Sequence, residues 1–132
     1  MKKTPVECRP KTEIEDRPLL SSDDAGRLED LFKLLANDTR LRLLHAIAKR
    51  EDIAVGELAE AVEMKPQAVS NQLQRLQAVG IVASRRDGNS VRYRVVDRCV
   101  LILMDRGLCL LEENERRLPG RAAARPVSFD RE

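Results

Sequence analysis

The chain has 132 residues, a formal net charge of +2 and only 2% aromatic residues, with no tryptophan. This length suits one domain with short tails, and the core must be built from leucine, valine and alanine. The sequence has neither an apolar run near the roughly 18 residues of a membrane span nor an apolar signal region, so we expect a cytoplasmic protein with no membrane partner and three reduced cysteines.

The first 22 residues are charged and contain three prolines, a composition typical of a flexible arm. The stretch Ser21–Asp23 offers capping side chains ahead of apolar residues at helical spacing, so a helix is predicted over about 24–36. A second helix is predicted over 39–49, with Asn37 or Asp38 as its cap and Arg40 on its solvent face.

A helix-turn-helix is predicted next. Residues 56–63 form a short helix, and a second helix starts at Pro66 and ends at about Val79, just before Gly80. Proline suits a first helical position and glycine the position past the end. The stripe expected to be buried in the second helix is Val69, Leu73, Leu76 and Val79.

The opposite face of this second helix carries amides, one hydroxyl and one guanidinium rather than the lysine and glutamate of an ordinary solvated face. Such donor and acceptor groups read base edges in the major groove of DNA. The residues expected to contact DNA from this helix are Gln67, Ser70, Asn71, Gln74 and Arg75.

A basic β-hairpin follows, with strands predicted over 81–86 and 90–96 around an Asp87-Gly88-Asn89 turn. Side chains alternate along the second strand, so Tyr93 is expected on one face and Arg92 on the other. The hairpin residues expected to contact DNA are Arg85, Arg86, Asn89, Arg92 and Arg94. The fold class is therefore mainly α with a β-hairpin wing, a winged helix-turn-helix.

The distribution of charge agrees with this interpretation. Residues 65–98 include seven basic and two acidic side chains, whereas residues 23–63 include six basic and ten acidic ones. Lysine and arginine displace counterions from DNA phosphates, so a basic patch on the helix and hairpin is typical of a nucleic-acid binder. A merely solvated arginine-rich hairpin is the alternative.

The last predicted helix runs from Arg98 to about Arg117 and has Asp97 as its cap. It is apolar around most of its circumference, which indicates burial on more than one side. In a chain of this size the second burying surface is most simply another subunit, and Gly107 would allow close approach. The domain is thus expected over 23–117, followed by a disordered tail over 118–132.

The stretches LEDLFKLLANDTRLRLLHAI and VGELAEAVEMKPQAVSNQLQRLQAVGIVASRRDGNSVRYRV, with the apolar helix after them, resemble the ArsR/SmtB family of bacterial winged-helix repressors. One departure is Gln72, where the family commonly has histidine. The resemblance implies a homodimer through the first and last helices that binds an inverted-repeat operator in double-stranded DNA and releases it when an inducer binds. The expected interface residues are Leu28, Val100, Leu103, Met104, Gly107, Leu108 and Leu111.

Three cysteines are the candidate inducer ligands. Cys99 and Cys109 lie ten residues apart in one helix, about 15 Å along the axis, so they cannot share an ion within one chain. In an antiparallel pair of these helices centred near Met104, Cys99 of one chain would lie opposite Cys109 of the other. Cys8 in the arm could add a third sulfur.

The resemblance bears on this site as well. The family's zinc site in the last helix is matched by Asp97, by Cys99 in place of histidine and by Glu113, but its second histidine position falls at Leu110. Thiolates favour soft ions. The hypothesis is a sensor of As(III), Hg(II), Cd(II) or Pb(II) with Cys8, Cys99 and Cys109 as ligands.

Other interpretations remain open. The cysteines can be packing residues, since thiols in apolar helices often serve as small hydrophobes. Two of them can instead form a disulfide in a redox- or persulfide-sensing repressor. A third alternative is an inducer-free module whose last helix binds another protein. The single His45 is expected to be structural, and no nucleophile–base constellation or phosphate loop points to an enzyme.

Overall fold

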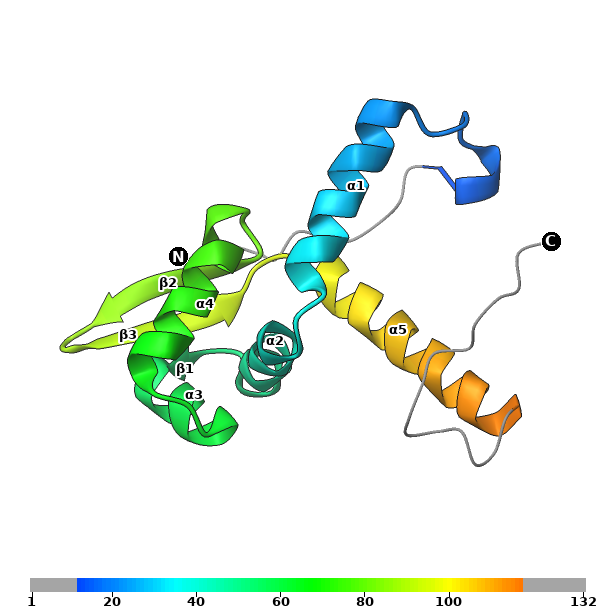
Figure 1. Cartoon of the computed structure of the whole chain (residues 1–132). Helices are drawn as coiled ribbons and strands as arrows, with labels where there is room; N and C mark the ends of the chain where they lie inside the picture. The colour runs from blue at the N-terminus through cyan, green and yellow to red at the C-terminus, as the bar shows by residue number, and fades with distance from the viewer. Residues whose placement is uncertain (1–11, 118–132) are drawn as a thin grey trace. The chain divides into compact units, whose positions relative to one another are not determined.

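The computed structural model describes residues 12–117. Residues 1–11 of the expected arm and the whole expected tail, residues 118–132, lie outside this range. The chain divides into two compact units between Leu101 and Ile102, inside the last helix. The elements are η1 (Ile14–Asp16), α1 (Ser22–Leu35), α2 (Asp38–Arg50), β1 (Ile53–Ala54), α3 (Val55–Val62), α4 (Pro66–Ala78), β2 (Val82–Asp87), β3 (Ser90–Val95) and α5 (Arg98–Arg117) (Figure 1). Within the described range, no helix has the length and apolarity needed to cross a membrane.

Three helices begin at the side chains that the sequence offers as caps. Ser21 Oγ accepts a hydrogen bond from the backbone N–H of residue 24, and Asn37 Oδ1 accepts one from the N–H of residue 40, both at 3.1 Å. Asp97 Oδ1 accepts one from the N–H of Cys99 at 2.9 Å. Each bond satisfies a backbone donor that has no partner within its helix.

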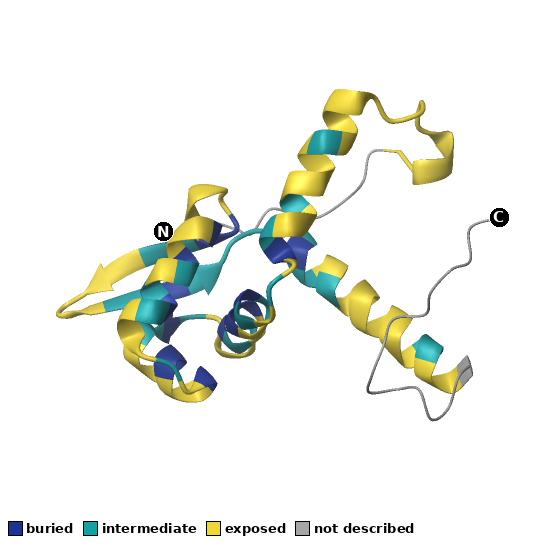
Figure 2. Cartoon of the chain, in the orientation of Figure 1, coloured by how far each residue is buried: buried dark blue, intermediate teal, exposed yellow. Residues whose placement is uncertain are grey.

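The core lies where α2, α3, α4 and the sheet face one another (Figure 2). Its fully buried side chains are Leu43, Leu44, Ile47, Ile53, Leu58, Val69, Leu73, Leu76, Ile81 and Val82. The predicted stripe of α4 is confirmed except at its end, because Val79 is 59% exposed. The helix stops at Ala78, the chain turns through Gly80 with φ 81°, and Ile81 takes the buried position instead.

The turn between α3 and α4 uses a left-handed residue other than glycine. Glu63 has φ 57°, its N–H donates to the carbonyl of Glu60, and the N–H of Met64 donates to the carbonyl of Ala59 at 2.9 Å. This pair of bonds is a Schellman motif, which satisfies the last carbonyls of α3. The chain then enters α4 at Pro66, so a tight turn separates the two helices of the helix-turn-helix.

The sheet is antiparallel in the order β1-β3-β2. The two-residue strand β1 was not predicted from the sequence, and it pairs Ile53 with Tyr93. In the hairpin Asp87 pairs with Ser90, so the turn itself contains only Gly88, with φ 62°, and Asn89. Tyr93 is 5% exposed, on the face of β3 opposite to Arg92, and this separation of the two side chains is the one that alternation along the strand predicts.

Helix α5 changes character along its length. Val100, which was expected at the dimer interface, is 4% exposed and instead packs in the core of its own chain. Beyond it, large apolar side chains of α5 are exposed: Ile102, Leu103, Leu108, Leu110 and Leu111. Gly107 has open space where a side chain would be. These residues form an unpartnered apolar surface within the described part of the chain.

Candidate nucleic-acid interface and inducer site

The outer face of α4 presents the polar side chains that the sequence predicts. Gln67, Asn71, Gln74 and Arg75 are exposed, and Ser70 is half-buried. Gln67 Nε2 donates to Asn71 Oδ1 at 3.1 Å, one helical turn apart. This bond orients the Asn71 amide so that its Nδ2 group and the second lone pair of Oδ1 remain available, the pair of functions that recognises adenine in the major groove.

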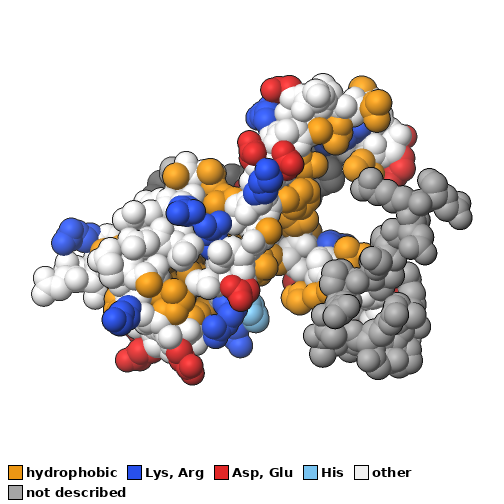
Figure 3. Space-filling model, in the orientation of Figure 1, with side chains coloured by type: hydrophobic (Ala, Val, Ile, Leu, Met, Phe, Trp, Pro, Cys, Tyr) orange, Lys and Arg blue, Asp and Glu red, His pale blue; other side chains and the backbone are white. Residues whose placement is uncertain are grey.

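The wing arginines are divided between two faces of the hairpin. The register places Arg85 opposite Arg92, on the same face as Arg94, whereas Arg86 lies opposite Val91 on the other face. Arg85 and Arg86 are exposed, as is Asn89 in the turn, while Arg92 and Arg94 are half-buried. Figure 3 shows basic side chains over the hairpin and over the helices beside it.

Asp52, a residue between α2 and β1, binds two of these arginines. Arg92 Nε lies 2.7 Å from Asp52 Oδ1, and an Arg85 guanidinium nitrogen lies 3.0 Å from Oδ2. Arg92 also donates to the backbone carbonyl of Asp52. The hydrogen bond from Arg92, helped by Arg85, lowers the pKa of Asp52. Asp52 thus ties the wing to the segment between α2 and β1 and partly neutralises it.

Replacement of Asp52 by asparagine is expected to lower the Tm at pH 7 by a few degrees, on the order of what an exposed ionic cluster contributes in a domain of this size. Because the folded-state pKa of Asp52 is lowered, its contribution is present above the ordinary aspartate pKa of about 3.9 and is lost as pH falls through the folded value. Thermal unfolding of the wild type and the variant at pH 7 measures the difference in Tm, and the same pair at about pH 3 measures how far this difference shrinks.

The matched control is Glu60→Gln, which removes an exposed carboxylate on α3. It should leave the Tm at pH 7 close to that of the wild type. Equal unfolding temperatures for the wild type and the Asp52 variant at pH 7 would show that the ionic cluster contributes nothing to stability.

The prediction that Arg40 faces solvent is wrong. It is 7% exposed and is the buried charged residue among those described. Its Nε donates to Gln72 Oε1 on α4 at 2.9 Å, and its Nη1 donates to the carbonyl oxygen of Leu34 in the last turn of α1 at 2.7 Å. Gln72, the departure noted in the sequence, therefore bonds inward to Arg40.

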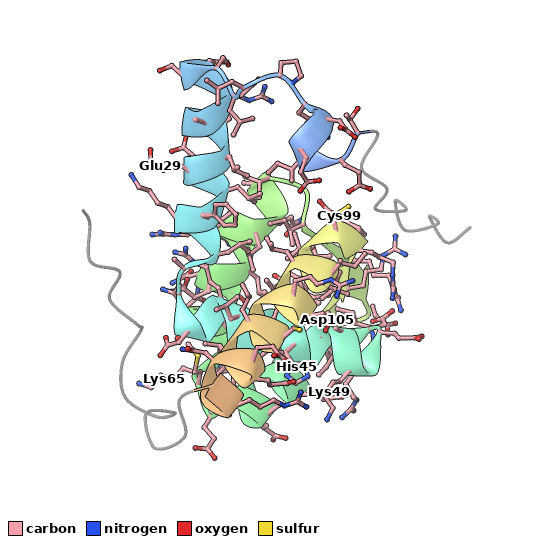
Figure 4. The ribbon with its side chains drawn as sticks, turned by 90° about the vertical axis from the view of Figure 1, so that its right-hand side faces the viewer. Glu29, His45, Lys49, Lys65, Cys99 and Asp105 are labelled. Carbon is pink, nitrogen blue, oxygen red and sulfur yellow. The ribbon has the colours of Figure 1, made fainter. Side chains whose placement is uncertain are left out.

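The candidate inducer ligands are only partly within the described structure. Cys8 lies outside the described residues. Cys99 is half-buried in the first turn of α5 (Figure 4), and Cys109 is exposed farther along the same helix. Within the described part of one chain, no three histidine, cysteine or acidic residues are grouped to hold a metal ion. Any site that uses these two cysteines together must therefore include residues from elsewhere.

The other residues compared with the zinc site have structural partners of their own. Asp97 caps α5 through Cys99, and Glu113 accepts a hydrogen bond from Arg116 at 3.3 Å. Leu110, at the second histidine position, is exposed and apolar. His45 is exposed on α2. The described residues of α5 include the exposed Cys109 thiol and several carboxylates, but no imidazole.

Known proteins of similar sequence and structure are DNA-binding transcriptional regulators. A family model described as the MarR family matches residues 37–90, which include the helix-turn-helix and most of the hairpin. The chain is 55% identical to the AntR antimony-specific transcriptional repressor, over 83% of this chain and 99% of that one, with a TM-score of 0.70.

Two further relatives extend the comparison. A transcriptional repressor SmtB homolog from Synechocystis is 38% identical over 64% of each chain. A homodimeric winged helix-turn-helix DNA-binding domain from Mycobacterium bovis, described as a possible ArsR-family regulator, is 27% identical, with a TM-score of 0.57; the match covers 84% of this chain and all of that one. The fold is thus that of winged helix-turn-helix DNA-binding regulators, some of them homodimeric.

Proposed function

Because the chain belongs to the ArsR/SmtB family of winged-helix transcriptional repressors, we propose that it represses by binding an inverted-repeat operator as a homodimer and releases it when a thiophilic ion binds. The proposed inducers are trivalent Sb(III) or As(III), held by Cys8, Cys99 and Cys109. The observation that carries the proposal is the 55% identity to an antimony-specific repressor. Antimony was not among the ions inferred from the sequence.

The chemistry of the donor groups supports this choice of ion. Thiolates are soft ligands and select soft ions over the hard ions that oxygen ligands prefer. Trivalent antimony and arsenic form stable pyramidal complexes with three thiolates, and the chain has three cysteines. Cys99 and Cys109 are separated by about 15 Å along one helix, so each proposed site combines cysteines from both subunits.

The placement of the two cysteines on α5 supports a link between ion binding and DNA release. They flank the exposed apolar residues Leu103 and Leu108, which we propose as the main contact between subunits, together with Leu28, Met104, Gly107 and Leu111. Two recognition helices must lie about 34 Å apart to enter successive major grooves. An ion that binds across the interface shifts the dimer between two arrangements only through its differential affinity for them.

The test is fluorescence anisotropy of the full chain on a labelled duplex from the DNA upstream of its gene. The titrants are Sb(III), As(III), Hg(II), Cd(II), Pb(II) and Zn(II) under reducing conditions. Release by the trivalent ions at the lowest concentration is the expected result. Peroxide and polysulfide are titrated separately, without reductant. Release only by these oxidants would favour thiol oxidation, which the exposure of Cys109 permits. Binding that no titrant disturbs would contradict both forms of sensing.

On the DNA side, Asn71→Ala is expected to weaken operator binding by about 1–3 kcal/mol and to relax the preference for one base. The reason is that the Asn71 amide is exposed and is oriented by Gln67, so its loss removes a directed contact. The measurement is the affinity for the operator and for single-base variants of it.

Lys65→Ala provides the contrasting variant, because Lys65 is an exposed cation at the start of α4. It should weaken binding to all sequences similarly and reduce the slope of log affinity against log salt by about 1. If Asn71→Ala kept the full discrimination between operator variants, this assignment of the α4 face would be wrong.

A further inference from the structure

Helix α1 is attached to the rest of its compact unit through its last turn. Of its 14 residues only Leu35 is buried, and Leu28 and Phe32, which share a face with it, are 40% and 47% exposed. The orientation of this helix is therefore set near its C-terminal end. At this end, the backbone carbonyl of Leu34 accepts a hydrogen bond from the rest of the domain, and the side chain of Leu35 is buried.

Arg40 occupies the junction between this end of α1 and the recognition helix α4. The carbonyl of Leu34 is among the last four of α1, which have no partner within the helix, and it accepts the Arg40 Nη1 bond at 2.7 Å. A guanidinium at a helix C-terminus is also favoured by the helix dipole. The same side chain bonds Gln72 of α4 at 2.9 Å through Nε.

We propose that Arg40 is a positioning residue: its buried guanidinium fixes the angle between α1 and the recognition helix, so that an arrangement of the dimer determines where α4 lies on DNA. The inference rests on the proposed operator binding by a homodimer that uses α1. Gln72 then accepts the hydrogen bond that connects Arg40 to α4, a role distinct from that of the exposed α4 amides that are proposed to contact bases.

The geometry of the guanidinium explains why one side chain can serve this purpose. Its donors are held in a rigid planar fork, so fixing the Leu34 carbonyl and the Gln72 amide oxygen on two donors fixes the two helices relative to each other. Because Arg40 is 7% exposed, water does not readily replace either partner. Breaking one bond leaves a buried donor unpaired, which costs free energy. A different placement of α4, in which the donor finds another partner, is therefore favoured over a more mobile α4.

The experiment measures how strictly the dimer requires its half-site spacing. Footprinting first locates the operator upstream of the gene. A second duplex carries one extra base pair between the half-sites, which displaces one of them by about 3.4 Å and rotates it by about 35°. The readout is the ratio of the two dissociation constants, measured by anisotropy with no inducer present.

We expect the wild type to prefer the native spacing by at least about tenfold, and Gln72→Leu to reduce this ratio to about threefold or less. Gln72→Glu keeps an acceptor for Arg40 and should restore most of the ratio. Arg42→Met, which removes an exposed arginine from α2, the helix that carries Arg40, is the matched control and should leave the ratio unchanged. Thermal unfolding confirms that each variant is folded at the assay temperature.

The outcomes separate the inference from the function on which it rests. A wild type that binds its operator with a spacing preference, together with a Gln72→Leu variant that keeps the same preference, would overturn the role of Arg40 and leave the repressor function standing. A wild type that binds no upstream duplex, or binds without any spacing preference, would contradict the proposed dimeric operator binding and the inference with it. A uniform loss of affinity on both duplexes, with the ratio unchanged, would show that the link is only structural.

Discussion

A Cys99→Ser repressor is expected to bind its operator as tightly as the wild type and to remain bound when Sb(III) or As(III) is added. Ion binding in an allosteric regulator typically changes the affinity for the second ligand by about 5–150-fold, and this entire change should be lost. The reason is that a serine hydroxyl does not replace a thiolate as a ligand for a soft ion. Cys99 lies at the start of α5, where its backbone N–H donates to Asp97 Oδ1, and the substitution leaves both groups of this capping bond in place.

The measurement is anisotropy of a labelled operator duplex during titration with each ion, under reducing conditions and at one protein concentration. Cys109→Ser and Cys8→Ser are expected to behave similarly if all three thiolates bind the ion. Asp105→Ser, an exposed change on the same helix, is the control and should release DNA normally. Normal release from Cys99→Ser by every ion would remove Cys99 from the proposed site.

Leu73→Ala is expected to destabilise the fold by about 2–5 kcal/mol, because Leu73 is fully buried and truncation leaves a cavity under the recognition helix. Since small domains have a total stability of about 5–15 kcal/mol, this is a large share of it. The affected side chain lies next to Gln72 on α4, so the loss should also reduce operator binding. Chemical denaturation followed by circular dichroism gives the change in the free energy of unfolding.

Val79→Ala is the matched control in the same part of the chain. Val79 is 59% exposed just after the last residue of α4, and its truncation should change stability by less than about 0.5 kcal/mol. All variants need the same protein concentration, since the stability of a dimer depends on it. Equal destabilisation by the two substitutions would contradict the burial pattern on which the recognition helix depends.

Much of this fold can be predicted from the sequence because the signals are local. The caps at Ser21, Asn37 and Asp97, proline at the start of α4 and glycine at its end each specify a boundary. Alternation in β3 predicts that Tyr93 and Arg92 lie on opposite faces of the strand, and in the structure Tyr93 is the buried one. These features depend on backbone groups a few residues away, so they need no knowledge of the tertiary structure.

The features that sequence reasoning missed depend on distant partners. Periodicity placed Arg40 outward, because the pattern cannot reveal that a carbonyl at the end of α1 and an amide on α4 would meet it. Strand β1 has only two residues, too few for an alternating pattern, and it exists because β3 provides an edge. Asp52 likewise gains its role only once the wing folds back beside it.

The candidate inducer site was the least predictable part. The spacing of Cys99 and Cys109 excludes a shared ion within one chain, but spacing alone does not reveal which groups approach from elsewhere. The departure at Gln72 is visible in the sequence, but it does not reveal a partner for the side chain. That partner is Arg40 of α2, 32 residues away in the chain.

The buried aromatic ring in the central strand of the sheet has a practical consequence for spectroscopy. The chain has one tyrosine and no tryptophan, so ultraviolet emission excited at the phenol band originates from Tyr93 alone. This residue pairs with Ile53 on one side and Ser84 on the other. Its emission intensity and anisotropy therefore report the state of the wing without any attached dye, and a stopped-flow record of that signal can time the response of the wing to DNA.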